Sequence, residues 1–262
     1  MRAVILAAGR GSRLGPYTSD RPKCLVEVGG RSLLERQVGA LRAAGAERIV
    51  VVTGWCHQAF TGPAARLGFS LLVNPRWAET TMVETLAVAE DWLTEGPTLV
   101  SYGDIVYSAA TAADLAATEA PLAVSYDRNW RALWERRFAD PLADAETFAV
   151  DPAGLVLEIG GRPEHLDQVQ GQYLGLLRFT PEGWSHAARL RGQDPPVAHL
   201  TDLLGRIVRD GRLPVTGVPT DQPWFEFDHP SDLLLGREVL AALDAPAASP
   251  PLNGVLVNGV LA

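Results

Sequence analysis

The sequence predicts an α/β protein with a mostly parallel sheet and helices on both faces. Three short runs of apolar and β-branched residues, at 3–8, 47–53 and 69–74, are typical of buried strands. The segments between them, 31–45 and 56–67, are predicted to be helices. Because strand and helix alternate, each helix is expected to connect two parallel strands, which gives a three-layer fold.

Local signals justify the first elements. Residues 3–8 form an unbroken apolar run that ends at Gly9, which suits a buried strand better than a short helix. The helix at 31–45 has apolar residues at helical spacing, with Ser32 as its N-cap and Gly45 as its end. Both elements are therefore expected to belong to the core.

The later elements follow from the same kinds of signal. Two alternating segments joined by Pro152-Ala153-Gly154 predict a hairpin over 148–159. We expect one domain at 1–244 and a tail rich in Ala, Pro and Gly at 245–262, with an inserted lobe at 127–170. Further strands are expected at 97–102, 122–126, 174–179 and 212–220, and further helices at 82–93, 181–191, 198–210 and from Ser231.

Charge and composition narrow the classes of partner. The net charge is −8 with no basic tract, which argues against a nucleic acid and favours a small ligand. No apolar stretch approaches the roughly 20 residues of a membrane-spanning helix. Cys24 and Cys56 are too few for a disulfide framework or a zinc site, which fits a reducing cytosol. We expect a cytoplasmic protein without a membrane partner. Whether the chain forms a homo-oligomer stays open.

A flexible, basic loop follows the first strand. Gly9, Arg10, Gly11, Ser12 and Arg13 place two glycines, a hydroxyl and two guanidinium groups within five residues. Such a loop can wrap around an anion and direct backbone N–H groups toward it. The loop is therefore predicted to bind phosphate.

A single lysine follows this loop. Lys23 is the one lysine among 23 basic residues, and the other 22 are arginines. Where a generic surface cation is needed the chain uses Arg, so Lys23 indicates a site that requires a compact point charge. The alternative is a surface lysine spared by compositional drift, and the neighbouring loop makes this less favoured.

The stretch from Leu6 to Val28 resembles a known signature. It reads L-A-A-G-R-G-S-R-L-x-P-x-T-x-x-x-P-K-x-L-x-x-V, and it is similar to that of the nucleotidyltransferases that make sugar nucleotides and CDP-alcohols. Ser12 stands for the commoner Thr and Tyr17 for the commoner Leu. The resemblance implies a Rossmann-like nucleotidyltransferase fold, although the spacing is neither that of a P-loop nor that of the dinucleotide-binding fingerprint. It also implies nucleotide contacts from Leu6, Ala7, Ala8, Gly9, Arg10, Gly11, Ser12 and Arg13.

Two acidic residues are expected to hold a metal ion. Asp104 follows a strand and Gly103 at the carboxyl edge of the sheet, where it can hold Mg²⁺ between phosphates and contact the nucleotide. The family has a metal-ligating Asp here. A helix cap is the alternative, but the next helix is expected only near Ser108. Asp228 occupies the place of the family's second metal carboxylate, so the resemblance implies Mg²⁺ bound by both residues.

The loop 74–81 is expected to face the same site. It leaves a strand at the carboxyl edge of the sheet and opens the helix at 82–93. Thr80 and Thr81 either contact the base or only cap this helix, and the residues favour neither. The segment resembles choline-phosphate and phosphonate cytidylyltransferases, in which an Asn is common at the place of Thr81. The base therefore stays open, with a preference for cytosine.

The lobe at 127–170 combines aromatic and cationic residues. Aromatic rings and guanidinium groups could enclose a phosphorylated head group, and similar stretches occur in cytidylyltransferases for small phosphorylated or phosphonate acceptors. The alternative is a small helix whose Trp residues cover the sheet edge. The acceptor is accordingly expected at Trp130, Trp134, Arg136, Arg137 and Gln172.

Together these features predict a Mg²⁺-dependent enzyme that transfers CMP from CTP to a small phosphomonoester or phosphonate and releases pyrophosphate. Arg13 is expected on the β- and γ-phosphates, and Lys23 on the α-phosphate and the acceptor oxygens. Catalysis would then rest on positioning and charge neutralisation. The alternatives are a sugar-1-phosphate nucleotidyltransferase using dTTP, UTP or GTP, and a non-catalytic regulatory homologue.

Overall fold

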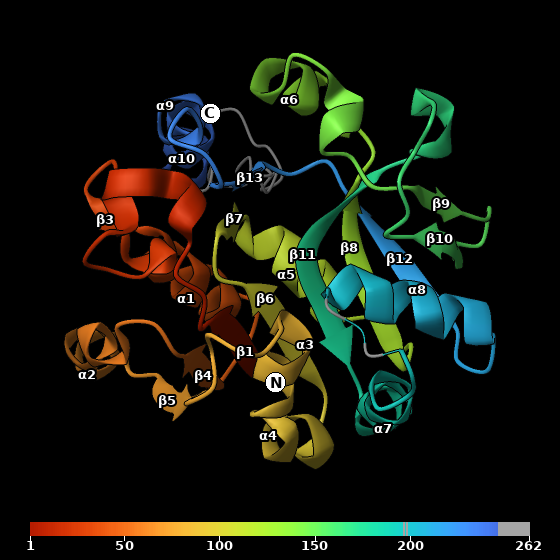
Figure 1. Cartoon of the computed structure of the whole chain (residues 1–262), viewed down its shortest axis with the longest axis horizontal. Coiled ribbons are helices and arrows are strands. Elements are labelled where there is room, and N and C mark those ends of the chain that lie inside the picture. The colour runs from red at the N-terminus through yellow and green to blue at the C-terminus, as the bar shows by residue number, and fades with distance from the viewer. Residues whose placement is uncertain (196, 198, 246–262) are drawn as a thin grey trace, which may run out of the picture.

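The computed structural model describes residues 1–195, 197 and 199–245, and the expected tail falls almost entirely outside them. Its centre is a sheet of seven strands in the order β12-β8-β11-β6-β1-β4-β5 (Figure 1). The strands are β1 (Arg2–Ala7), β4 (Arg48–Thr53), β5 (Ser70–Val73), β6 (Thr98–Tyr102), β8 (Leu122–Asp127), β11 (Gln172–Phe179) and β12 (Val215–Thr220).

The sheet is mostly parallel. β1 pairs in parallel with β4 and β6, and β12 pairs in parallel with β8. β11 lies between β6 and β8 and is antiparallel to both. The predicted mixed, mostly parallel α/β sheet is confirmed, and the carboxyl ends of β1 and β6 reach the same edge.

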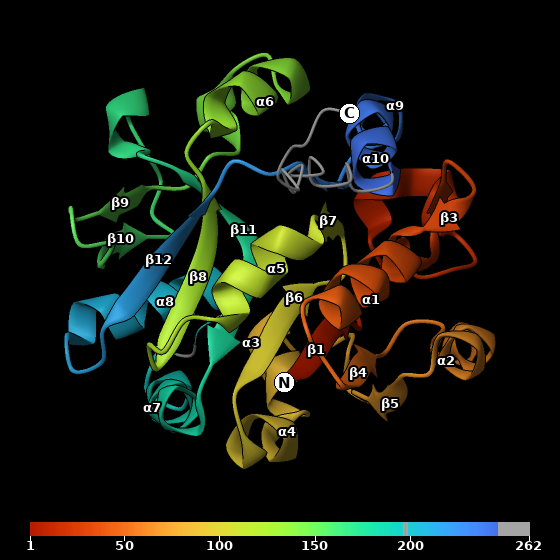
Figure 2. The ribbon, with the colours of Figure 1, turned by 180° about the vertical axis from the view of Figure 1, so that it is seen from behind.

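Helices cover both faces of this sheet (Figures 1 and 2). The alternation of β1 explains why both faces are apolar, since Val4 and Leu6 enter one core cluster whereas Ala3, Ile5 and Ala7 enter the other. One face carries α1 (Leu33–Ala43) and α5 (Ala109–Ala116). The opposite face carries α3 (Met82–Ala87), α4 (Glu90–Glu95), α7 (Pro181–Arg191) and α8 (Leu200–Asp210).

Local signals placed these helices well, with two differences. Ser32 caps α1 in a reciprocal capping box with Glu35, as the sequence predicts. The helix expected at 82–93 is divided into α3 and α4 around Val88 and Ala89. The helix expected at 56–67 begins as a 3-10 turn (His57–Phe60) before α2 (Thr61–Leu67).

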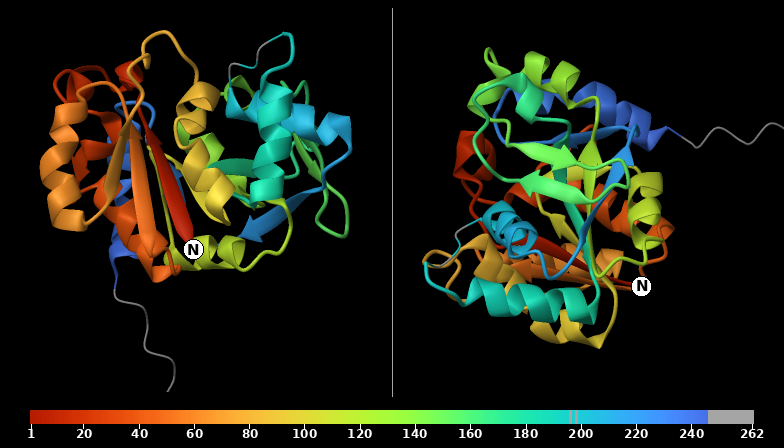
Figure 3. Two further views of the ribbon diagram at one scale, coloured as in Figure 1. Left: turned by 90° about the horizontal axis from the view of Figure 1, so that it is seen from below. Right: turned by 90° about the vertical axis from the view of Figure 1, so that its right-hand side faces the viewer.

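Smaller elements lie outside the seven-stranded sheet, and Figure 3 shows the molecule from two further sides. The sequence did not predict the short pairs β2 (Glu27–Val28) with β3 (Arg31–Ser32) and β7 (Ile105–Tyr107) with β13 (Trp224–Glu226). Among the described helices, none combines the length and apolar character needed to cross a bilayer. The remaining elements are α6 (Trp130–Arg137), the predicted hairpin of β9 (Phe148–Val150) and β10 (Val156–Ile159), α9 (Asp232–Leu235) and α10 (Arg237–Asp244).

Candidate active site

The loop after β1 packs directly on Lys23. Gly11 has a φ of +67°, and a Cβ at this position would lie 2.8 Å from the Cβ of Lys23. Both the left-handed backbone and the close contact therefore require glycine. The hydroxyl of Thr18 donates to the carbonyl oxygen of Gly11 at 2.8 Å and fixes the loop from the other side. Lys23 is buried beneath the loop.

Asp104 is held at the carboxyl end of β6 by two neighbours. The side-chain amide of Gln37 on α1 donates to the carbonyl oxygens of Tyr102 at 2.7 Å and Ile105 at 2.6 Å. A Cβ on Gly103 would lie 2.5 Å from the carbonyl oxygen of Leu6, so only glycine lets the chain pass this close to β1. The position of Asp104 is thus set by α1 and β1 together.

The pairing of β13 with β7 brings Asp228 to Asp104. Glu226 lies opposite Ile105 in the antiparallel register, and the N–H of Phe227 donates to the carbonyl oxygen of Asp104 at 2.9 Å. The N–H of Asp228 in turn donates to a carboxylate oxygen of Asp232 at 2.9 Å. Residues more than a hundred positions apart therefore meet at one edge of the sheet.

Two cations contact the two predicted metal carboxylates, and Lys23 links them. The Nζ of Lys23 donates to Asp104 at 2.9 Å and also to Asp228. A guanidinium nitrogen of Arg13 lies 2.8 Å from the second oxygen of Asp228. Burial alone would lower the pKa of Lys23, but the charges of Asp104 and Asp228 outweigh it and raise this pKa. Arg13, Lys23, Asp104 and Asp228 thus form one cluster, and Lys23 is fully charged in it.

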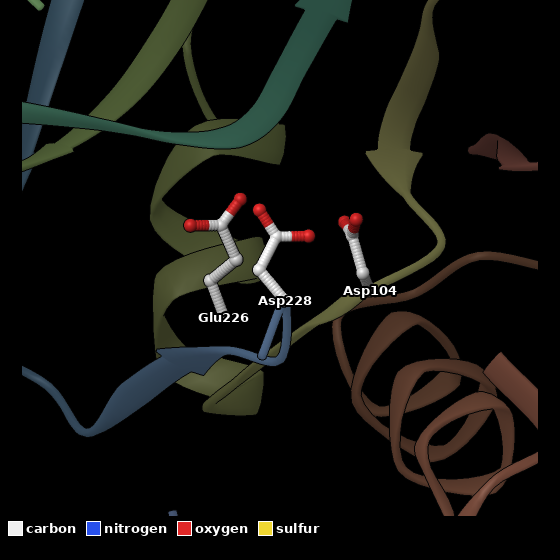
Figure 4. Close-up of side chains that lie close together, drawn as sticks. All are labelled: Asp104, Glu226 and Asp228. Atoms are coloured by element: carbon white, nitrogen blue, oxygen red, sulfur yellow. The ribbon is translucent and has the colours of Figure 1, made fainter. Parts of the chain in front are cut away.

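Glu226 also belongs to this cluster, although the sequence did not predict its place there. One oxygen atom from each of Asp104, Glu226 and Asp228 lies within 4.8 Å of the others. Figure 4 shows Glu226 and Asp228 extending from the same segment toward the space beside Asp104. Burial and the neighbouring charges of Asp104 and Asp228 raise the pKa of Glu226 to about 8. The E-x-D spacing of Glu226 and Asp228 is the signal in the sequence that points to this pairing.

A cavity of about 190 Å³ lies between the loop and the cluster. Met82, at the start of α3, contributes an unpredicted apolar wall. The structure therefore gathers most of the predicted nucleotide site around one space, because Leu6, Ala7, Gly9, Gly11, Arg13, Lys23 and Asp104 all line it.

Three residues of the same loop lie outside that lining. The carbonyl oxygen of Ala8 accepts a hydrogen bond from the N–H of Trp55 at 2.9 Å. The guanidinium of Arg10 lies over the Trp55 ring, 4.9 Å from its centroid. Ser12 is exposed at the start of a 3-10 helix. Their contacts with a nucleotide stay predictions.

Thr80 and Thr81 also lie outside the lining. The Thr81 hydroxyl accepts from the N–H of Glu84 and caps α3. The Thr80 hydroxyl donates to the carbonyl oxygen of Arg76 at 2.8 Å and accepts from the amide of Asn74 at 2.9 Å. Both hydroxyls thus have local partners, and a contact of either with the base stays a prediction.

A family model described as a MobA-like NTP transferase domain matches residues 3–169. The chain belongs to this family. The matched segment includes the loop, Lys23 and Asp104, whereas Glu226 and Asp228 follow it in the chain.

Relatives support the same assignment. The chain is 35% identical over 186 residues to CTP:phosphoglutamine cytidylyltransferase of Campylobacter jejuni. The matched region covers 69% of this chain and 73% of that protein. It is 36% identical over 249 residues to CMP-5'-(3-aminopropyl)phosphonate synthase of Streptomyces rubellomurinus. This match covers 88% of this chain but 37% of that longer protein.

A solved structure agrees with the fold. The inositol-1-phosphate CTP transferase from T. maritima superposes with a TM-score of 0.77, and the match covers 95% of this chain and 98% of that one. At 19% identity, this likeness supports the nucleotidyltransferase fold alone.

A second cavity of about 280 Å³ opens beside the first in this MobA-like NTP transferase domain. It shares Arg13, Met82 and Asp104 with the first cavity, so the two spaces meet at the cluster. Trp134 and Gln172, two of the predicted acceptor residues, line this second cavity. We name it the acceptor cavity after these two predicted residues.

The other predicted acceptor residues are placed differently. Trp130 is buried and donates its indole N–H to the carbonyl oxygen of Val169 at 3.1 Å. Arg136 is exposed and pairs with Glu238 of α10 at 2.9 Å. Because α6 packs its aromatic side on the core, neither side chain lines the acceptor cavity, and their contact with an acceptor stays a prediction.

Arg137 is committed to ion pairs within the protein. Its side chain is 1% exposed and contacts Asp232 at 3.1 Å and Glu226 at 3.2 Å. The guanidinium also lies 5.0 Å from the ring centroid of Trp134. Asp232 accepts a hydrogen bond from the backbone N–H of Asp228, so Arg137 stabilises the position of Asp228 through Asp232. Arg137 does not line the acceptor cavity.

Arg137→Ala is therefore expected to lower stability. The change leaves Asp232 buried without its counter-charge, which typically costs about 3–5 kcal/mol of unfolding free energy. Arg136→Ala removes the same charge from an exposed pair and should cost less than about 1 kcal/mol. Urea unfolding of both variants measures the difference, and equal midpoints would contradict the structural role of Arg137.

Proposed function

We propose that the chain transfers CMP from CTP to a small phosphomonoester or phosphonate and releases pyrophosphate. One observation carries this proposal, namely that two cavities meet at Arg13 and Asp104 beside Lys23. A nucleotide in the first cavity and an acceptor in the second would present the α-phosphorus and the attacking oxygen to the same cations. The names of the related cytidylyltransferases support CTP and this class of acceptor.

The transfer needs no general base. An anionic oxygen of the acceptor attacks the α-phosphorus, an O–P bond forms, and the bond from the α-phosphorus to the bridging oxygen breaks. Pyrophosphate leaves with the electron pair of that bond. Negative charge increases on the phosphoryl oxygens, so the protein must position two anions and offset their charge. Lys23 is suited to the α-phosphate and the acceptor oxygen, and Arg13 to the β- and γ-phosphates.

The acidic residues fit Mg²⁺. Asp104, Glu226 and Asp228 offer oxygen atoms within 4.8 Å of one another, and oxygen donors are the ligands that Mg²⁺ prefers. One carboxylate oxygen of Asp104 is buried and has no hydrogen-bond partner within the described residues. When bound there, Mg²⁺ would offset negative charge on the phosphates. Asp104 and Asp228 are the proposed ligands, and Glu226 is a third candidate.

The ion pairs of the cluster suggest how charge is redistributed on binding. Lys23 and Arg13 offset the charges of Asp104 and Asp228. In the complex, the same two cations would turn to the phosphates while the carboxylates hold the metal. The side chain of Arg13 is 60% exposed, which leaves it room for this change of partner.

A pyrophosphate-release screen tests the proposal. CTP, UTP, GTP and dTTP are each combined with 2-aminoethylphosphonate, phosphoethanolamine, choline phosphate, a phosphorylated amino acid and glucose 1-phosphate. We expect release with CTP and a small non-sugar acceptor, and a CMP-linked product by mass spectrometry. Turnover confined to glucose 1-phosphate with UTP, GTP or dTTP would overturn the proposal in favour of a sugar-nucleotide enzyme.

A further inference from the structure

The lining of the acceptor cavity is acidic. Asp144 and Glu146, from the segment between α6 and β9, line it in addition to the three carboxylates of the cluster. Asp144 forms no ion pair with any described residue, and Glu146 accepts one hydrogen bond, from the hydroxyl of Thr201 at 3.1 Å. Burial raises the pKa of both carboxyl groups. Neither carboxylate therefore has a direct ion-pair partner among the described residues.

A buried amide in the same cavity also lacks a partner. Gln172 is 7% exposed, and its side-chain oxygen has no hydrogen-bond donor among the described residues. Buried polar atoms are nearly always paired, so an unpaired acceptor in a cavity wall indicates a ligand that donates. His199 also lines the cavity, but its side chain accepts from the N–H of Asp202 and forms no hydrogen bond with the Gln172 oxygen.

The lining of the cavity bears on two kinds of cation. A quaternary ammonium has no N–H and is bound mainly by the faces of aromatic rings. Tyr102, Trp134, Tyr173 and Trp224 line the cavity, and the Trp134 ring already has the guanidinium of Arg137 5.0 Å from its centroid. The two carboxylates and the unpaired amide oxygen add hydrogen-bond acceptors, which a cation with several N–H groups can use and a quaternary ammonium cannot.

We propose that Asp144, Glu146 and Gln172 form a subsite for a primary ammonium group on the acceptor. The inference rests on the proposed function for the other end of the molecule, whose phosphate or phosphonate would lie at Arg13 and Lys23. The acceptor class is then an amino-alkyl phosphonate or phosphomonoester. Asp144 and Glu146 balance the ammonium charge, and Gln172 accepts one of its N–H groups.

Three acceptors isolate the ammonium group. 2-Aminoethylphosphonate carries it, propylphosphonate replaces it with a methyl group, and the N,N,N-trimethyl derivative of 2-aminoethylphosphonate keeps the charge without N–H groups. With CTP, kcat/KM for the primary amine should exceed that for each of the other two by about tenfold or more, as expected for losing a charge-assisted hydrogen bond. Equal values for the amine and propylphosphonate would overturn the subsite.

Variants assign the preference to residues. Asp144→Asn and Glu146→Gln should each reduce the amine-to-propyl ratio of kcat/KM by about tenfold. Asp167→Asn and Glu164→Gln are matched controls, because both residues are exposed in the same lobe and outside the cavity. An unchanged ratio in both Asp144→Asn and Glu146→Gln would contradict the assignment.

Binding without turnover separates this inference from the proposed function. Calorimetric titration of the unmodified chain with 2-aminoethylphosphonate and with propylphosphonate measures the subsite directly. Tighter binding of the amine without pyrophosphate release from any nucleotide would retain the subsite and refute the transferase. Turnover of both acceptors with equal affinity would do the opposite, and an absence of both turnover and selective binding would refute both.

Discussion

Lys23→Ala should lower kcat by about two to three orders of magnitude, the loss seen when one preorganised charge on a transition state is removed. Lys23 lines the first cavity, and its ammonium contacts both Asp228 and Asp104, the latter of which lines the two cavities. The proposed transfer has no general base, so positioning and neutralisation carry the rate acceleration. Steady-state kinetics of pyrophosphate release with CTP and 2-aminoethylphosphonate measures the effect.

The same variant should also report on the charge balance of the cluster. Without Lys23, the carboxylates of Asp104 and Asp228 face each other with less compensation, so the melting temperature should fall. Added Mg²⁺ should restore part of that loss, because a bound cation stabilises the folded chain by mass action.

Two variants serve as controls for Lys23. Arg21→Ala removes a cation two residues away, which is exposed and pairs with Asp20, and it should leave turnover within about twofold, as for surface changes. Lys23→Arg keeps the charge but presents a planar fork where Asp104 and Asp228 enclose a compact ammonium, so it should not restore wild-type turnover. More than a tenth of wild-type turnover in Lys23→Ala would remove Lys23 from the mechanism.

The part of the site near the N-terminus could be predicted because its signals are local. The apolar run of β1, the two glycines of the loop and the single lysine all lie within 24 residues. Gly11 is required where the loop packs on Lys23, so this glycine in the pattern reflects a packing contact with that side chain. Asp104 could be placed for a similar reason, because it follows Gly103 at the end of β6, a strand recognisable from its own residues.

Glu226 and Arg137 could not be placed in this way, because their environments depend on long-range pairing. Glu226 reaches the cluster through the register of β13 against β7, and neither of these three-residue strands is identifiable from its own residues. The sequence of α6 shows cations beside aromatic rings, which suits a ligand site or a packed helix equally well. Only the position of Asp232, far along the chain, decides that Arg137 is an internal ion-pair partner.

Asp228→Asn is expected to have the second largest effect, an increase of about tenfold or more in the Mg²⁺ concentration for half-maximal activity. Asp228 is 4% exposed and contacts both Lys23 and Arg13. Asparagine has nearly the same shape and can keep the backbone hydrogen bond to Asp232, so the fold should persist while one anionic ligand is lost. A Mg²⁺ titration of pyrophosphate release at saturating CTP measures the change.

The comparison with Asp104→Asn and Asp221→Asn makes this prediction specific. Asp104→Asn should shift the Mg²⁺ titration in the same direction, because its carboxylate lies on the other side of Lys23 and one of its oxygens is buried without a partner. Asp221 is exposed and pairs with Arg128, so Asp221→Asn removes the same charge without touching the cluster and should leave the titration in place. If Asp228→Asn also left the titration unchanged while kcat fell, Asp228 would act only by orienting Lys23 and Arg13. The metal would then depend on Asp104 and Glu226, which the same titration of Glu226→Gln would reveal.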